Sequence, residues 1–376
     1  MLRIDGEDAL GQDGDEGAGP LPRRRALGGL VLGLGSYAGL RLAAADPAAT
    51  DAWYSQGVYP VIEGGLRRAS SWAPFSIAEV LLLASIALVA FRAWRDGVRV
   101  LRGQRKLGRT LAGWGLSLIG WAGLTYGVFV AVWGLNHARQ PYAVHSGLEP
   151  GMADVDEVVG FLTMLVLECN ALASQVNREM LAVKPGDERI HAAYASLEER
   201  VPVLAGQRRD HLRRPWISPV LSALGISGIY SPFTAEAHLN GDMPVITQAF
   251  TACHEEAHAR GFAREDEANF IAWQVCRASE EPELRYSGTY VAAVLTYRAL
   301  ERRDAHGAAI VWRMLSEEVL ADLGRVREYW RKKRTRATDV AVRTNDLYLK
   351  SQGQAAGTES YGRMVDLLLA EWRGGS

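Results

Sequence analysis

The stretch TACHEEAHARGFAREDEANFIAW, residues 251–273, places two histidines four residues apart, with a glutamate directly after the first. On a helix, His254 and His258 lie one turn apart on the same face, so that two imidazole nitrogens can meet one tetrahedral Zn²⁺ ion. Glu255 stands beside them, where it can act as a general base. The stretch therefore predicts a metal-binding helix that carries its own base.

A catalytic zinc site needs a third protein ligand and keeps its fourth position open. If one straight helix ran from His254 through Glu265, the rise of ~1.5 Å per residue would leave Glu265 more than ~10 Å beyond His258. Gly261 is where a left-handed cap can end this helix, so that a second helix carries Glu265 in its first turn. Glu267, two residues later, stays open as the alternative third ligand.

Asn269 lies four residues after Glu265 on the same face of the second helix, where it can accept a hydrogen bond from the outer nitrogen of a ligand histidine. The stretch resembles the glutamate-zincin metallopeptidases, whose second helix carries Glu-x-x-Ala-Asn in some families, and Glu265, Ala268 and Asn269 match this form. The resemblance implies that Glu265 is the third ligand and Glu255 the general base. The metzincin pattern does not fit, because its last ligand position holds Arg264, which cannot bind zinc.

The N-terminal third of the chain differs in composition from the rest. Residues 1–22 are acidic and glycine-rich, and they predict a disordered tail. Three apolar stretches follow, at residues 26–45, 75–91 and 111–135, each about long enough to cross a bilayer. A cleaved signal peptide is the alternative for the first of them. Because residues 92–109 are rich in arginine and lysine, we expect this loop inside and everything after the third span outside the cytoplasm.

The expected organisation is thus a tail (1–22), a three-span transmembrane region (23–136) and an extracytoplasmic domain (137–376). Most of the last part has the period of amphipathic helices. Residues 215–247, just before the motif, are rich in proline, glycine and serine and predict a small strand element. The fold class is mainly α: transmembrane helices, then a mostly helical zincin-like domain. Residues 231–240 are expected to form either an edge strand that pairs with an extended peptide or an ordinary packed loop.

The chain also resembles a family of uncharacterised multi-pass bacterial membrane proteins known as domain of unknown function 3810. Five segments carry this resemblance in order, and they are residues 133–136, 228–240, 251–273, 285–288 and 348–370. The resemblance implies a membrane-bound zinc peptidase in the bacterial cytoplasmic membrane, with a substrate that the family does not define.

The expected function is peptide-bond hydrolysis by a zinc-activated water, with Zn²⁺ on His254, His258 and Glu265 and with peptides, proteins and the lipid bilayer as partners. The formal net charge of −1 argues against nucleic acid as a partner. A di-iron helical bundle is one alternative, because Glu188-x-x-His191 and Glu255-x-x-His258 are two Glu-x-x-His pairs. An inactive, membrane-tethered binding or scaffold protein is the other. The sequence leaves the substrate and the oligomeric state open.

Overall fold

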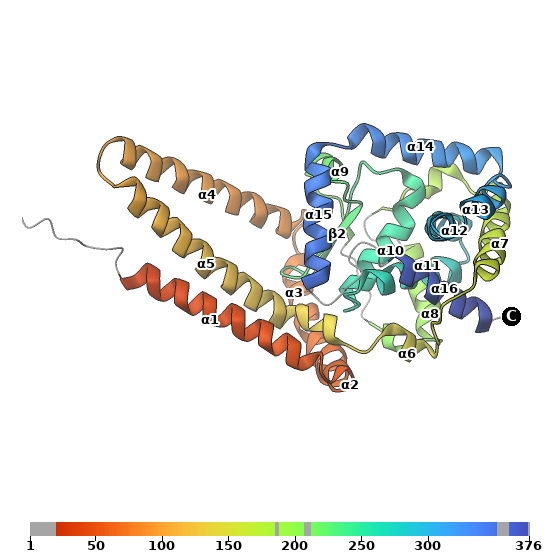
Figure 1. Ribbon diagram of the computed structural model, residues 1–376, viewed down its shortest axis with the longest axis horizontal. Coiled ribbons are helices and arrows are strands. Elements are labelled where there is room, and N and C mark those ends of the chain that lie inside the picture. Colours follow the sequence, from red (N-terminus) through yellow and green to blue (C-terminus); the bar gives the residue numbers. More distant parts are fainter. Residues whose placement is uncertain (1–19, 185–187, 207–211, 352–360, 375–376) are drawn as a thin grey trace, which may run out of the picture. The chain divides into compact units, whose positions relative to one another are not determined.

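Figure 1 shows the computed structural model, which describes residues 20–184, 188–206, 212–351 and 361–374. The chain forms two compact units. Unit 1 contains the described residues up to Ala38 together with Ser85–Val128, and unit 2 contains Gly39–Ala84 and the described residues from Phe129 onward. The prediction of a mainly helical chain is confirmed.

Among the described residues, three helices are long and apolar enough to cross a membrane, and they are α1 (Pro20–Ala43), α4 (Ile77–Leu101) and α5 (Leu107–Val132). They overlap the three apolar stretches of the sequence, but α4 continues to Leu101 and so includes the first ten residues of the loop expected at 92–109. The predicted tail, residues 1–22, lies outside the described residues except for its last three, which begin α1.

Glycines bring α1 and α5 into close contact within unit 1. A Cβ atom added to Gly123 would collide with the backbone of Gly29, and one on Gly29 would collide with the backbone of Gly120. Small residues allow this approach, which is how helices commonly pack inside a bilayer.

The rest of the chain builds unit 2. Its helices are α2 (Pro47–Thr50), η1 (Asp51–Val58), α3 (Tyr59–Ser71), η2 (Gly134–Ala138), α6 (Tyr142–Ser146), α7 (Val155–Ala173), η3 (Arg178–Leu181), α8 (Glu188–Glu198), η4 (Pro202–Leu204), α9 (Ser218–Leu224), η5 (Val245–Thr247), α10 (Gln248–Ala259), α11 (Glu265–Ala278), α12 (Pro282–Glu301), α13 (Ala305–Trp312), α14 (Glu317–Lys333), α15 (Arg336–Ser351) and α16 (Tyr361–Gly374). Helix α11 is buried at the centre, in contact with α8, α10, α12 and α16 (Figure 1). The helices of the motif therefore form the core of this unit, because their apolar side chains pack on every side.

A small sheet precedes the motif helix, as the sequence predicted. Its strand order is β1 (Leu212–Arg213), β3 (Glu236–Leu239), β2 (Gly228–Ser231), with β3 parallel to β1 and antiparallel to β2. The expectation of an edge strand within residues 231–240 was wrong, since β3 is the central strand. The edge strands of this sheet are β1 and β2, because β3 pairs with both of them.

Two buried glutamates tie the sheet to the start of α4. The carboxylate of Glu236 on β3 accepts hydrogen bonds from the backbone N–H groups of Ile77 (3.0 Å) and Ala78 (2.7 Å), in the first turn of α4. In return Glu79 accepts from the N–H groups of Trp216 and Ile217, at the start of α9. A carboxylate at a helix N-terminus satisfies free donors and the helix dipole together. The second apolar helix is therefore anchored to unit 2 by its first turn.

Candidate metal centre

A reverse turn at Gly261 folds the motif back on itself. Gly261 has φ +83°, its N–H bonds to the carbonyl of His258, and the N–H of Phe262 bonds to the carbonyl of Ala257. This pair of bonds is the Schellman arrangement, which ends a helix with a left-handed residue and is most easily formed by glycine. The predicted cap at Gly261 is thus confirmed, and α11 starts four residues later with Glu265 as its first residue.

We expect Gly261→Ala to destabilise the protein by about 1–3 kcal/mol, because the left-handed conformation is costly for alanine and the new Cβ would lie 3.0 Å from Tyr59 and 3.1 Å from Asn136. For a unit of this size the melting temperature should fall by roughly 3–8 °C, measured by thermal unfolding of the full chain in detergent. Gly324→Ala on α14 is the matched control, since its Cβ meets nothing within 4 Å and its conformation is helical. Equal melting temperatures for the two variants would contradict the role of the turn.

The turn brings three side chains together that are separated in sequence. One ligand atom from each of His254, His258 and Glu265 lies within 4.8 Å of the others. Nε2 of His254 is 3.4 Å from one carboxylate oxygen of Glu265, and Nε2 of His258 is 3.5 Å from the other. The side chain of Glu265 is 30% exposed, against 12% and 9% for the histidines. Two imidazole nitrogens and a carboxylate oxygen thus converge, with the Glu265 side chain partly exposed to solvent. They form a donor set suited to a divalent metal.

The protonation of His258 is set by its neighbours. Its Nδ1 lies 2.8 Å from the carbonyl oxygen of Phe262, which can only accept, so Nδ1 carries a proton and Nε2 faces Glu265. A backbone carbonyl on the outer nitrogen is a frequent arrangement for metal-binding histidines. Burial alone would lower the pKa of His258, but the hydrogen bond and negative charge of Glu265 raise it to about 9. Burial likewise raises the pKa of Glu265, yet the two histidines hold it well below its ordinary value.

These shifts give the site a defined pH dependence. In the metal-free protein the stability from His258 is fully present below its unfolded pKa of ~6.5 and is lost as pH rises through about 9, whereas that from Glu265 is present above ~4.3 and lost as pH falls. A metal must displace the His258 proton, so its apparent affinity should rise about tenfold per pH unit between roughly pH 6.5 and 8. Calorimetry in buffers of different ionisation enthalpy should show release of about one proton. An affinity independent of pH over this range would contradict the assignment.

Glu255 lies beside the three ligands on the inner side of α10. It is 4% exposed, and its Oε2 is a buried atom with no hydrogen-bond partner among the described residues. Burial raises the pKa of its carboxyl, and the positive charges of His254 and His258 offset this only in part. A Cβ on Gly228, the first residue of β2, would lie 2.8 Å from the Cδ atom of Glu255. A carboxylate with a raised pKa and a free oxygen is suited to accept and return a proton.

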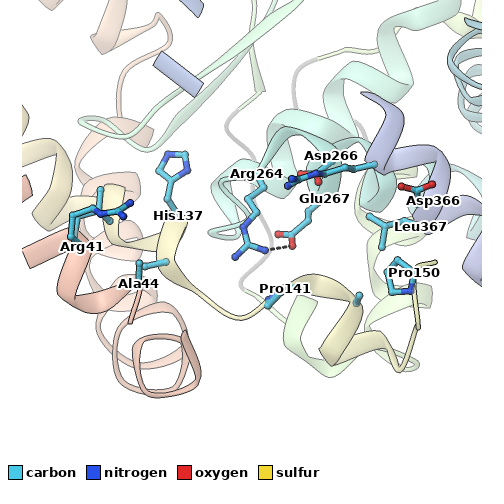
Figure 2. A pocket seen from close by; sticks show the side chains of 14 residues that line it. Arg41, Ala44, His137, Pro141, Pro150, Arg264, Asp266, Glu267, Asp366 and Leu367 are labelled. Carbon is cyan, nitrogen blue, oxygen red and sulfur yellow. Dashed lines mark hydrogen bonds and ion pairs between the residues drawn. The ribbon is translucent and has the colours of Figure 1, made fainter. Parts of the chain in front are cut away.

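The structure separates Glu265 from Glu267, which the sequence alone left as alternatives. Glu267 is buried, and its Oε1 accepts from the backbone N–H of Tyr142 at 2.9 Å and from Nη1 of Arg264 at 2.7 Å, the contact drawn in Figure 2. It therefore belongs to a different set of contacts from the two histidines. Arg264, which occupies the last metzincin ligand position, is engaged by this carboxylate.

Other sequence-predicted residues lie apart from the three ligands. Asn269 is buried in α11, but within the part of the chain that the structure describes it makes no hydrogen bond to His254 or His258; the outer nitrogen of His258 meets the Phe262 carbonyl in its place. Glu188 and His191, needed by the di-iron alternative, lie on α8 and are not in the described group of metal-capable side chains. The di-iron arrangement therefore has no geometric support in this structure.

Residues just after the third apolar helix contact the end of α10 and the turn that follows it. Nε1 of Trp133 donates to the carbonyl of His258 at 3.2 Å, and the ring of Trp133 lies edge-on to the imidazole, 6.1 Å away. Asn136 lies against Gly261, so that a side chain there would meet its Oδ1. In the sequence, residues 133–136 carry part of the family resemblance, and no local signal places them against the motif.

Two further supports were not found by sequence reasoning. Arg139 is 1% exposed; its Nε donates to Asp51 at 2.9 Å and its Nη1 to the carbonyl of Gly261 at 3.0 Å. Tyr59 donates its hydroxyl to the carbonyl of Ala259 at 2.8 Å. Asp51 begins η1, a π-helix, which is rare and often occurs near functional sites. The segment between the first two apolar helices thus contacts the end of the motif helix directly through Tyr59 and its turn through Asp51 and Arg139.

Comparison with known proteins gives one family. A family model described as "Protein of unknown function (DUF3810)" matches residues 54–369, from η1 to α16. No curated protein and no solved structure matches the chain. The matched range contains α10, α11 and every supporting residue described above except Asp51.

Proposed function

The chain belongs to the DUF3810 family of proteins of unknown function, and from the centre that it builds we propose that it is a membrane-bound zinc metallopeptidase. The observation that carries the proposal is the convergence of His254, His258 and Glu265 within 4.8 Å. With Glu255 next to the first ligand, this set has the three protein donors and the base of a hydrolytic zinc site, and it leaves the fourth position open.

The donor set fits Zn²⁺, because two neutral imidazole nitrogens and one carboxylate oxygen are borderline ligands that zinc accepts in tetrahedral geometry. When bound, Zn²⁺ would act as a Lewis acid that polarises the scissile carbonyl and acidifies water. His258 is kept in the required tautomer by the Phe262 carbonyl. Glu255 accepts the proton of the attacking water through its free Oε2 and returns it to the leaving amine.

The edge strand β2 offers a place for an extended substrate. Gly228 at its start lies against Glu255, and Ile229 is 47% exposed. On its side away from β3, β2 pairs with no other described strand. A peptide added to this edge would gain backbone hydrogen bonds and run past Glu255. Because Gly228 has no side chain, the carboxylate of Glu255 can lie directly against the backbone of β2.

The compact units support the expected topology. With three membrane-crossing helices, residues 46–76 and the chain after residue 136 lie on the same side of the bilayer. Both belong to unit 2, where Arg139 and Asp51 form a buried ion pair. The basic residues 92–109 favour the opposite, cytoplasmic side for the remaining loop. The proposed location of the centre is therefore extracytoplasmic and close to the membrane.

The test is cleavage of a diverse peptide library by the zinc-loaded, full-length protein in lipid nanodiscs, with new peptide termini identified by mass spectrometry. Removal of the metal by chelation should abolish cleavage and one equivalent of Zn²⁺ should restore it. Cleavage that persists without metal would overturn the proposal. Two iron ions per chain would support the di-iron alternative, and full zinc occupancy without cleavage of any peptide would support the scaffold.

A further inference from the structure

Unit 2 contains a cavity of ≈ 570 Å³, whose lining side chains are drawn in Figure 2. It is lined by the end of α1, by η2, α6 and their flanking segments, by the start of α11 and by the first two turns of α16. Its charged lining is balanced, with three arginines and three acids: Arg41, Arg264, Arg363, Asp266, Glu267 and Asp366. A cavity of this size suits a small polar ligand, and its balance of charge suits one that carries both signs.

A buried negative charge lies next to this cavity. Glu267 is 4% exposed, and its Oε1 receives the Tyr142 N–H and the Arg264 guanidinium. Its Oε2 is buried and has no hydrogen-bond partner among the described residues. The other terminal nitrogen of Arg264 donates to the carbonyl of Arg139 at 2.7 Å. The charge of Glu267 is therefore only partly satisfied, and it favours a cation in the adjoining cavity.

Three other charged side chains of the cavity, Arg41, Arg363 and Asp366, can also contact a ligand. In the described ranges, Arg41 and Arg363 form no ion pair within 4 Å, and Asp366 accepts no hydrogen bond. Both arginines are exposed and Asp366 is half-buried. The cavity therefore offers guanidinium groups to an anion at its rim and carboxylates to a cation deeper inside. A primary ammonium joined by a short linker to a phosphate satisfies both.

The position of the cavity identifies the source of such a ligand. Arg41 lies in the last turn of α1, at the end of a helix apolar and long enough to cross a membrane. Arginines at such helix ends meet the headgroup layer of a bilayer. We infer that this cavity binds the headgroup of an aminophospholipid of the ethanolamine type, with the phosphate on Arg41 and Arg363 and the ammonium on Asp366, where the negative charge of Glu267 also favours it. None of the residues that line the cavity is one of the three proposed metal ligands.

Native mass spectrometry of the full-length protein tests this inference. The protein in detergent is mixed with equal amounts of phosphatidylethanolamine, phosphatidylcholine and phosphatidylglycerol of identical acyl chains. Phosphatidylethanolamine should bind about tenfold better than either competitor, because choline has no N–H donor and glycerol no positive charge. Arg41→Ala and Asp366→Asn should each weaken its binding about tenfold, whereas Arg336→Ala, an exposed arginine on α15, should change nothing.

Soluble O-phosphoethanolamine separates a lipid from a free metabolite as the ligand. If O-phosphoethanolamine at equal concentration does not displace phosphatidylethanolamine, the site is one for a lipid. If the soluble compound binds as tightly as the lipid, the assignment to a lipid is overturned. Equal binding of the three lipids would also overturn the inference, as would undiminished phosphatidylethanolamine binding by both Arg41→Ala and Asp366→Asn. Metal content should stay at the wild-type value in all variants, since none of the altered residues is a metal ligand.

Discussion

Glu255→Gln is expected to keep one metal ion per chain and to reduce peptide cleavage by about 10²–10⁴-fold. Glutamine has the shape of glutamate but cannot accept a proton at neutral pH, so the variant removes the base and leaves His254, His258 and Glu265 in place. Because the carboxylate is 4% exposed with one unpartnered oxygen, its replacement by a neutral amide should cost little stability. The measurement is the initial rate of cleavage at saturating Zn²⁺, with metal content determined on the same sample.

The adjacent residue gives a matched control. Glu256 is buried as well, but its carboxylate receives Nε of Arg260 at 3.0 Å. Glu256→Gln should therefore lower the melting temperature slightly and leave the cleavage rate within a few-fold of the wild type. Wild-type cleavage by Glu255→Gln would overturn the proposed mechanism, whatever its metal content.

Glu265→Gln is expected to lose bound metal, with an affinity reduced by more than the about 10–100-fold typical of residues behind the ligands. A neutral amide is a weaker donor than the carboxylate, and it removes the negative charge that lies 3.4–3.5 Å from both histidine Nε2 atoms. Elemental mass spectrometry of the purified protein should therefore show zinc falling from about one per chain to near zero.

Glu267→Gln is the control for this prediction, and it also tests the alternative ligand. Since the Glu267 carboxylate is held by Tyr142 and Arg264, its replacement should weaken the packing around α6 and retain the metal. The reverse pattern, with metal kept by Glu265→Gln and lost by Glu267→Gln, would show that the ligand set differs from the one in this structure.

The central features of the fold and site were predictable because they are local in sequence. His254, His258 and Glu265 span twelve positions, and a helical period with one glycine sufficed to predict how they meet. The three apolar helices were equally visible, since length and composition alone define them. Which of Glu265 and Glu267 lies with the two histidines could not be predicted from the sequence. It depends on the tertiary contacts of Glu267 with the Tyr142 N–H and with Arg264.

The supporting contacts could not be predicted, because nothing local marks them. Arg139 meets Asp51 across 88 positions and the Gly261 carbonyl across 122, and Tyr59 meets Ala259 across 200. In sequence these are an ordinary arginine, aspartate and tyrosine beside apolar helices. The edge position of β2 was missed for the same reason, since strand order depends on which partners the hairpin finds.

The contact of Arg139 with Asp51 and Gly261 links the centre to the order in which the chain is made. Asp51 is synthesised before the second apolar helix, Arg139 after the third, and Gly261 more than a hundred residues later. If all three helices cross the bilayer, a failure of the second or third to insert leaves Asp51 and Arg139 in different compartments. The turn that presents Glu265 would then lack its support. Correct membrane insertion of all three helices is thus a precondition for an assembled centre.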